Sequence, residues 1–288
     1  MLDTQKYDNA TYDFGPMRAE VLRHSGDDLA VVNAARQSFG KRSTYNEDGS
    51  LKKGDISLLN FLADGIRSKE FHQMVMDMHS QHLEMHSDLA QGHDFDDMPA
   101  YDRIVEMLHA WRAVDAHDTP FNHVSVTVAI MVPLHIARQL VKHEYMPWSE
   151  MSRRYIDDCW WFHRPGLSDG VAWRYAPEQD VKQGSGHDMT PEDAAVAKQL
   201  LMRNTKVAFD NFIECKKLGM ATEQARQFMP LNMMVEVTWS GFLGAFAKML
   251  RQRLGLHAQQ EAQVLAKMLR EQVEPLFPHA LPALLKGV

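Results

Sequence analysis

The sequence predicts an α+β fold, with a central, mostly antiparallel sheet, helices packed on it and a helical C-terminal third. Residues 124–132 alternate apolar side chains with polar or small ones, which is the period of a half-buried strand. Glu20–Arg23 is expected to form a second, short strand. From Thr190 onwards the chain is expected to be helical, over 191–218, 222–229, 235–252 and 256–276.

The N-terminal part of the chain is expected to alternate polar segments with helices. Residues 1–16 are polar and rich in turn formers, as in a tail or a sheet edge. A helix capped by an Asp is predicted over 28–39, because apolar residues recur there roughly once per turn. A polar loop over 41–55 then precedes a second helix over 56–66.

Residues 71–97 are dense in His and Met. His82 and His86 are one helical turn apart, but methionines are interleaved with the histidines as on an amphipathic helix. We therefore interpret 71–97 as a helical insertion with a structural or surface role, and we predict no metal site. A further helix is expected over 102–113.

The densest group of polar side chains lies between Ala137 and Tyr155. Pro133 suits the first position of a helix, and Pro147 is expected to end that helix. Its apolar face consists of Leu134, Ala137, Leu140 and Val141, and its polar residues are Arg138, Gln139, Lys142 and His143. A strand would therefore lead into a helix whose polar residues gather at one rim.

The segment after Pro147 carries Glu150, Ser152, Arg153 and Arg154 without any hydrophobic period. A guanidinium group binds phosphate through two parallel N–H bonds, and a Ser hydroxyl adds a third donor. This segment is thus a candidate site for a single phosphate. The alternative is a solvated loop with a Glu–Arg ion pair.

A long loop is expected over 157–188, with the tetrapeptide KQGS at 182–185. Long ordered loops in compact domains are often functional. The helix after this loop has Pro191 at its first position behind Thr190, and Gly219 lies at its end.

Composition limits the classes of function. The 288 residues can form one domain with a full core, and neither a repeat nor a linker divides them, so a single domain over 1–288 is expected. A net charge of -7 argues against binding to a nucleic-acid polymer, which favours a basic surface. The two cysteines, Cys159 and Cys215, lack the spacing of a zinc site or a disulfide framework. Without a signal pattern at the start or an apolar run that spans a bilayer, we expect a cytoplasmic protein that does not contact membranes.

Taken together, four segments resemble the flavin-dependent thymidylate synthases, in family order. They are DLAVVNAARQSF at 28–39, HDTPFNH at 117–123, the signature ARQ…KH…E-x-S-x-RY within 137–155, and ARQFMPLN…RLGLHAQQE from 225 to 261. The resemblance covers almost the whole chain and leaves 71–97 as an insertion.

The resemblance implies roles for particular residues. Flavin contacts fall on Ser38, His117, Thr119, Asn122, Lys142, His143 and Glu144. Contacts to the phosphate and sugar of dUMP fall on Gln139, Glu150, Ser152, Arg153, Arg154 and Arg226, and the arginine beside the uracil ring is Arg253. A homotetramer with active sites between its subunits is also implied.

Several positions depart from the family pattern. The usual Arg-His-Arg is Lys142-His143-Glu144, and the later Ser and Asn are Pro147 and Ser149. Positions that normally offer Asn or Arg to the flavin are Phe242 and Gly244, and a third Asn position is Lys248. The residues expected to bind the nucleotide therefore match the family pattern better than the residues expected to bind the flavin. Lys-His, SRRY and KQGS resemble a divergent branch associated with phage, so the protein is expected to be phage-encoded and to act in the host cytoplasm.

The implied reaction is reductive methylation of dUMP at C5. Methylenetetrahydrofolate would supply the carbon, and FAD reduced by NADPH would supply the hydride. Arg253 would stabilise charge that develops on the uracil, and Ser152 would donate to the nucleotide. Neither cysteine has an evident activating neighbour, so an enzyme thiol is not expected to attack the substrate.

Three alternatives stay open at this point. The same scaffold could attach another one-carbon group, such as hydroxymethyl, to a deoxypyrimidine nucleotide. A catalytically silent homologue could bind the nucleotide alone. A metal-dependent phosphohydrolase could use His79, His82, His86 and the pairs His93-Asp94 and His117-Asp118, although these do not show the pattern of ligands around an open water position.

Overall fold

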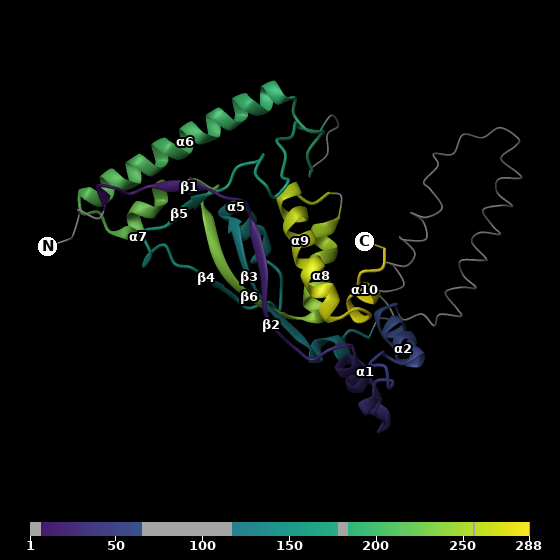
Figure 1. Cartoon of the computed structure of the whole chain (residues 1–288). Coiled ribbons are helices and arrows are strands. Elements are labelled where there is room, and N and C mark those ends of the chain that lie inside the picture. The colour runs from purple at the N-terminus through teal and green to yellow at the C-terminus, as the bar shows by residue number, and fades with distance from the viewer. Residues whose placement is uncertain (1–6, 65–116, 178–183, 256, 288) are drawn as a thin grey trace, which may run out of the picture. The chain divides into compact units, whose positions relative to one another are not determined.

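The computed structural model describes residues 7–64, 117–177, 184–255 and 257–287 (Figure 1). Its main sheet has the strand order β2-β3-β6-β4, from Arg18–Ser25, Ser125–Pro133, Met234–Phe242 and Trp148–Glu150. β4 runs antiparallel to β6, with Trp148 opposite Trp239. A second sheet pairs β1 (Tyr12–Phe14) with β5 (Trp160–Phe162) in parallel. These sheets and the helices around them confirm the α+β fold.

The alternation that predicts a strand over 124–132 is confirmed by β3, whose boundaries lie one residue later. Val126, Val128, Ile130 and Val132 are all buried. β2 confirms the strand expected at Glu20–Arg23 and is longer at both ends.

The helix predicted over 235–252 is wrong in its first half, because residues 234–242 form β6. Val235, Val237 and Trp239 are buried, whereas Glu236 and Thr238 between them are exposed. That is a period of two, which places alternate side chains on opposite faces of a sheet. Only the second half is helical, as α8 (Leu243–Leu254).

Helix α5 (Leu134–Leu140) follows β3 directly, and Pro133 is its N-cap with an extended backbone and not its first helical residue. The helix ends well before Pro147. The chain turns after Leu140, whose carbonyl accepts a hydrogen bond from the His143 N–H at 3.0 Å, and Tyr145 adopts a left-handed backbone conformation with φ 59°. Val141 lies beyond the helix and is exposed, so its expected place on the apolar face is wrong.

The described chain divides into two compact units. The first unit comprises Met1–Arg23, Val126–Gly241 and Met249–Gln272, and the second comprises His24–Ser125, Phe242–Lys248 and Val273–Val288. The expectation of a single domain stays a prediction.

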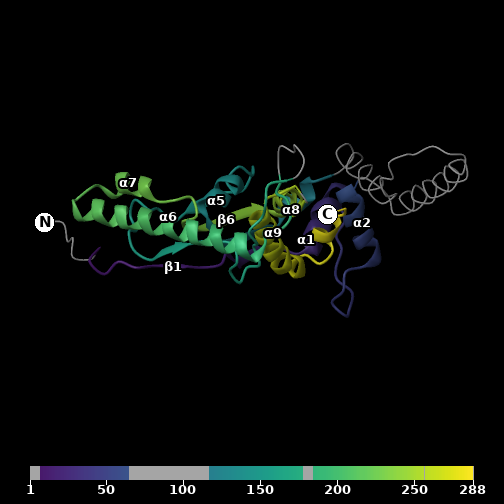
Figure 2. The same ribbon diagram turned by 90° about the horizontal axis from the view of Figure 1, so that it is seen from above.

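In the first unit, α6 (Pro191–Lys217) runs alongside β1 and β5 (Figures 1 and 2). Aromatic side chains connect these elements. Phe209 lies 4.9 Å from Tyr12, and Phe212 lies 4.7 Å from Trp160, measured between ring centroids. Thr190 caps α6 and Pro191 is its first residue, which confirms the predicted start. Short elements α7 (Thr222–Ala225) and η4 (Arg226–Phe228) pack on α6, and α9 spans Gln260–Val273.

In the second unit, α1 (Asp28–Arg36) packs against α2 (Lys53–Asp64) and η3 (Thr119–His123), and α10 (Ala280–Leu284) packs on α2. Asp27 caps α1, as an Asp was expected to do, and η2 (Gln37–Phe39) continues it. η5 spans Glu274–Leu276. The buried Asp28 accepts hydrogen bonds from the N–H groups of His279 and Ala280 at 2.8 and 3.0 Å, which joins α1 to the C-terminal segment.

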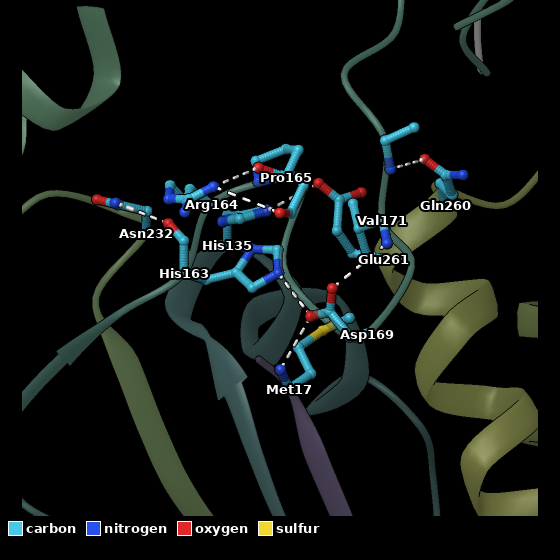
Figure 3. Close-up of polar contacts among 12 residues, drawn as sticks. Met17, His135, His163, Arg164, Pro165, Asp169, Val171, Asn232, Gln260 and Glu261 are labelled. Atoms are coloured by element: carbon cyan, nitrogen blue, oxygen red, sulfur yellow. Dashed lines mark hydrogen bonds and ion pairs between the residues drawn. The ribbon is translucent and has the colours of Figure 1, made fainter. Parts of the chain in front are cut away.

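A buried polar cluster anchors the loop that follows β5 (Figure 3). His163 Nε2 lies 2.9 Å from Asp169 Oδ2, and the main-chain N–H groups of Met17 and Val171 donate to the same carboxylate. The His163 carbonyl accepts a hydrogen bond from Asn232 Nδ2 at 2.9 Å. These contacts connect the loop to the segments that lead into β2 and β6.

The expected insertion over 71–97 and the helix expected over 102–113 lie outside the described residues. In the part of the chain that is described, none of the helices combines the length and the apolar character that crossing a membrane requires.

Candidate functional site

An open pocket of about 850 Å³ in the first unit surrounds the C-terminal end of α8. We call it the Arg253 pocket. Its lining consists of Gln139, Lys142, Gly184, Ser185, Gln252, Arg253, Gly255, His257, Ala258 and Gln259. Gln139 lies in the last turn of α5, Lys142 follows that helix, and Arg253 lies in the last turn of α8, so helix ends supply most of the polar groups.

Arg253 is held in one position. Its Nε donates to His143 Nε2 at 3.1 Å, and its Nη2 donates to the Gln139 carbonyl at 3.1 Å. A guanidinium nitrogen only donates, so His143 Nε2 must be unprotonated and accept. Burial lowers the pKa of Arg253 from its ordinary value, and the group nonetheless stays charged near neutral pH. The pocket therefore contains a fixed, partly desolvated cation.

Amide side chains form a second feature of the Arg253 pocket. Gln139 Nε2 donates to Gln259 Oε1 at 2.7 Å, and Gln259 is exposed. Gln139 was expected to bind the nucleotide, whereas Gln259 was only part of the quoted motif RLGLHAQQE. The motif could have identified Gln259 as a site residue, because Gln259 lies only six residues after Arg253, in the turn that follows α8.

The end of the long loop also reaches the Arg253 pocket. Main-chain hydrogen bonds join Tyr175 to His187 and Trp173 to Met189, at 3.0 and 2.8 Å. This ladder positions Gly184 and Ser185, the last two residues of KQGS, in the pocket lining. The sequence singled out this loop without assigning either residue to the site.

A second pocket of about 580 Å³, also in the first unit, lies between the segment after β4 and η4. We call it the Ser152 pocket. Its lining consists of Leu134, Glu150, Met151, Ser152, Arg153, Glu223, Gln224, Arg226, Gln227 and Met233. It brings together four residues expected to bind the phosphate and sugar: Glu150, Ser152, Arg153 and Arg226.

Arg154 forms an ion pair beside this pocket, and the local sequence did not indicate its partner. Its Nη2 donates to Glu223 Oε2 at 2.8 Å, and both side chains are about half exposed. Glu223 is separated from Arg154 by 69 residues, so no local pattern could have revealed it. A carboxylate of the same chain thus accepts one hydrogen bond from a guanidinium group that was expected to bind phosphate.

Arg153 points into the protein interior. It is buried, and its Nη1 and Nη2 donate to the carbonyls of Asp158 and Cys159 at 2.9 and 3.3 Å. The guanidinium carbon lies 4.5 Å from the Trp160 ring centroid, and burial lowers the pKa of Arg153. The structure thus gives Arg153 a role in holding the loop, and its expected contact with the nucleotide stays a prediction.

The two pockets share no lining residue. Within one chain, the arginine expected beside the base and the residues expected around the phosphate therefore lie in separate pockets. The resemblance had assigned both groups to one dUMP molecule.

The residues expected to bind flavin are divided between the units. Lys142, His143 and Glu144 follow α5 in the first unit, and Lys142 and Glu144 are exposed. The second unit contains Ser38 in η2, and Thr119 and Asn122 in η3, all exposed, together with His117, whose N–H donates to the Leu62 carbonyl at 2.8 Å.

The group in the second unit fits a flavin in its chemistry. Hydroxyl, imidazole and amide groups offer both donors and acceptors for the uncharged polar edge of a flavin and for its phosphates. The start of α8 lies against η3, because the Leu243 N–H donates to the Val124 carbonyl at 3.1 Å. A Cβ at Gly244 would lie 2.7 Å from Asn122 Oδ1, so this departure from the family leaves room that Asn122 fills.

The histidines of the phosphohydrolase alternative, from His79 to His93, lie outside the described residues. Among the residues that the structure does describe, no three His, Cys, Asp or Glu side chains are grouped so that they could hold a metal ion.

Comparison with known proteins identifies relatives. The sequence model of a family described as "Thymidylate synthase complementing protein" (Thy1) matches residues 20–279. A flavin-dependent thymidylate synthase of Ehrlichia ruminantium (strain Gardel) is 31% identical over 163 residues, which are 57% of this chain and 54% of the relative. One of Thermotoga neapolitana is 25% identical over 173 residues, 59% of this chain and 70% of the relative. The match thus spans about half the length of the first of these relatives.

A similar fold occurs in a solved structure, the UMP/dUMP methylase PolB from Streptomyces cacaoi bound with 5-Br dUMP. The TM-score is 0.65 at 20% sequence identity, with 95% of this chain and 96% of that chain covered. At this identity the likeness concerns the fold.

Proposed function

Because the chain belongs to the thymidylate synthase complementing protein family, we propose that it catalyses the reductive methylation of dUMP at C5 to give dTMP. In this reaction the C5–H bond is replaced by a C5–CH3 bond. Methylenetetrahydrofolate supplies the carbon and leaves as tetrahydrofolate, while NADPH is oxidised to NADP+. The observation that carries the proposal is the fixed guanidinium of Arg253 in a pocket large enough for a nucleotide.

Arg253 is the residue to which we assign the stabilisation of the reacting base. C5 of uracil becomes nucleophilic when negative charge collects on O2 and N3 of the ring. A cation whose position is set before reaction stabilises that charge without reorganisation, and partial burial strengthens the interaction. His143 and the Gln139 carbonyl hold Arg253 in place by accepting hydrogen bonds from its Nε and Nη2, and we assign its Nη1 to the uracil ring.

We assign the phosphate to the residues of the Ser152 pocket. Ser152 and Arg226 line it, and Arg154 lies beside it. A hydroxyl and two guanidinium groups provide charge-assisted hydrogen bonds to a phosphate monoester. Binding energy from the phosphate then orients the base, which is remote from it.

FAD would be held by Ser38, His117, Thr119, Asn122, Lys142 and His143, and when bound it would supply the hydride for the new methyl group. Glu144, an anion where the related synthases carry a cation, would repel flavin phosphates and is better placed near an uncharged part of the cofactor.

We propose a homotetramer whose active sites lie between subunits. The Arg253 pocket and the Ser152 pocket share no lining residue within one chain, and in such a tetramer one nucleotide would contact the two pockets of different copies. An apolar stripe on α6 is available for such contacts, because Val196, Leu200 and Val207 are all more than half exposed.

The visible spectrum of the purified protein, followed by titration with dUMP, tests the proposal. A flavin spectrum that changes as dUMP binds is expected. After incubation with dUMP, methylenetetrahydrofolate and NADPH, the nucleotide product should gain the mass of one methylene group. A gain equal to CH2O would instead support hydroxymethyl transfer. Protein that takes up no flavin when FAD is added would contradict the proposal and favour a silent nucleotide-binding homologue.

A further inference from the structure

Lys216 is a buried cation near the C-terminal end of α6, with 7% of its surface exposed. Its Nζ donates to the Met220 carbonyl at 3.0 Å and to Thr222 Oγ1 at 2.6 Å. The same atom lies 5.7 Å from the centre of the Tyr7 ring, within the range of a cation–π interaction. These three partners match the three donors of an ammonium group, so we assign Lys216 no direct contact with a ligand.

The two hydrogen bonds of Lys216 hold the turn between α6 and α7. Met220 lies in this turn, and Thr222 is the first residue of α7. The turn begins at Gly219, which has a left-handed backbone with φ 84° and donates its N–H to the Lys216 carbonyl at 2.9 Å. The helices that follow, α7 and η4, have four and three residues, too few to be stable alone. Their position therefore depends on contacts with the rest of the unit, and Lys216 supplies two of them.

α7 and η4 form one wall of the Ser152 pocket. Glu223 directly follows Thr222, and Arg226 begins η4 one turn later; both line the pocket. A displacement of Thr222 would therefore move both residues. Glu223 also accepts the hydrogen bond from Arg154 Nη2 at 2.8 Å, so the displacement would reach the guanidinium group beside the pocket as well.

Tyr7 links Lys216 to the opposite wall, which is the segment that carries Ser152. The Tyr7 hydroxyl donates to the carboxylate of Asp157. A turn connects Asp157 with Ser152, because the Ile156 N–H donates to the Ser152 carbonyl at 3.1 Å. Lys216 therefore contacts one wall of the pocket directly and the other wall through Tyr7.

We propose that Lys216 is a positioning residue of the Ser152 pocket: it holds α7 and η4 against the segment that carries Ser152, and so keeps Arg226 and Ser152 at the separation that binds one phosphate group. The inference rests on the proposed function. Lys216 lines neither pocket, so its effect on the phosphate passes through Thr222 and Tyr7.

The test compares the Kd values of dUMP and of deoxyuridine, which differ only in the phosphate, by isothermal titration. The ratio of the Kd for deoxyuridine to the Kd for dUMP measures the contribution of the phosphate. Lys216→Met keeps a long side chain and removes the ammonium group, and it should lower this ratio roughly tenfold, because charge-assisted hydrogen bonds to the phosphate weaken. The Kd for deoxyuridine should stay close to that of the wild type. A general loss of stability would weaken both ligands alike and leave the ratio unchanged.

Two further variants separate this role from a general effect of the substitution. Lys217→Met makes the same change at the next position, where the side chain is exposed and pairs with Asp8 and Glu214, and it should retain the wild-type ratio. Thr222→Val keeps the shape of the side chain and removes the acceptor hydroxyl, so the ratio should fall by roughly 3- to 10-fold. The double variant of Lys216→Met and Thr222→Val should lower the ratio no further than Lys216→Met alone, because both changes remove the same hydrogen bond.

The possible failures can be told apart. If the wild type binds dUMP no more tightly than deoxyuridine, the Ser152 pocket does not bind the phosphate, and the role of Lys216 fails with that assignment. If the wild type shows a large ratio and Lys216→Met retains it, only the role of Lys216 is overturned; should Lys216→Met not fold, an unchanged ratio in Thr222→Val overturns it. Formation of dTMP is measured separately. An absence of methyl transfer together with the expected Kd ratios would overturn the proposed function and still support the role of Lys216.

Discussion

The Nε of Arg253 donates to the Nε2 of His143 across 3.1 Å, which joins the end of α8 to the turn after α5. The sequence resemblance had assigned these two residues to different ligands, Arg253 to the uracil and His143 to the flavin. The structure makes His143 the acceptor that orients Arg253.

Removing this acceptor should release Arg253. We expect His143→Ala to lower kcat/KM for dUMP roughly tenfold, as for a lost hydrogen bond to a charged group. His143→Gln retains an oxygen that can accept from Nε and should recover part of the loss. Steady-state kinetics with dUMP as the varied substrate is the measurement. An equal loss of kcat/KM in the two variants would show that a hydrogen-bond acceptor at position 143 does not determine the activity.

The hydroxyl of Ser152 is expected to serve nucleotide binding and not flavin reduction. Ser152→Ala should raise the Kd for dUMP by roughly 3- to 10-fold, because one hydrogen bond to the nucleotide is lost. The rate at which NADPH reduces the flavin, followed by absorbance under anaerobic conditions, should stay close to that of the wild type. Loss of flavin reduction with unchanged dUMP binding would refute this role.

The ion pair between Arg154 and Glu223 should compete with the substrate phosphate. Glu223→Gln removes the carboxylate but keeps its size, so dUMP should bind a few-fold more tightly in low salt, and the gain should shrink as salt screens the charges. Both side chains are about half exposed, so the free energy of unfolding should change by less than about 1 kcal/mol. Isothermal titration at two salt concentrations measures the effect. Weaker binding in Glu223→Gln would mean that the carboxylate orients Arg154 for the phosphate.

The buried pair of His163 and Asp169 should control stability at acid pH. Burial by itself raises the pKa of Asp169, but the hydrogen bonds from His163, Met17 and Val171 outweigh it and hold the pKa below the ordinary 3.8. A carboxylate with a lowered pKa stabilises the fold above the unfolded pKa of about 3.9, and this contribution is lost as pH falls through the folded pKa.

Asp169→Asn should therefore lower the free energy of unfolding at neutral pH by roughly 3 kcal/mol, because it breaks a buried pair. The variant should also lose part of the acid dependence of stability below about pH 4. Asp188→Asn is the matched control, since Asp188 is 67% exposed and lies 3.5 Å from Arg174, and it should cost less than about 1 kcal/mol. Denaturant unfolding at several pH values measures both variants. Similar losses of unfolding free energy in Asp169→Asn and Asp188→Asn would show that the burial of the His163–Asp169 pair does not set its contribution to stability.

Features that depend on neighbouring residues could be predicted from the sequence alone. The alternation of Val126, Val128 and Ile130 predicted β3, and Thr190 followed by Pro191 predicted the start of α6. The order of four motifs predicted the family, which the match over residues 20–279 confirms. Each of these signals depends only on adjacent residues or on the order of motifs along the chain, so it can be recognised without the fold.

Features that depend on partners distant in sequence became visible only in the folded chain. Residues 235–252 were predicted to be one helix, in a part of the chain predicted to be helical from Thr190 onwards, but pairing with β4 makes their first half part of a strand. Arg153 and Arg154 are adjacent and look equivalent, yet one is buried against Trp160 and the other is paired with Glu223. The physical reason is that strand pairing, burial and ion pairs depend on which surfaces meet, and a local pattern of residues does not specify that.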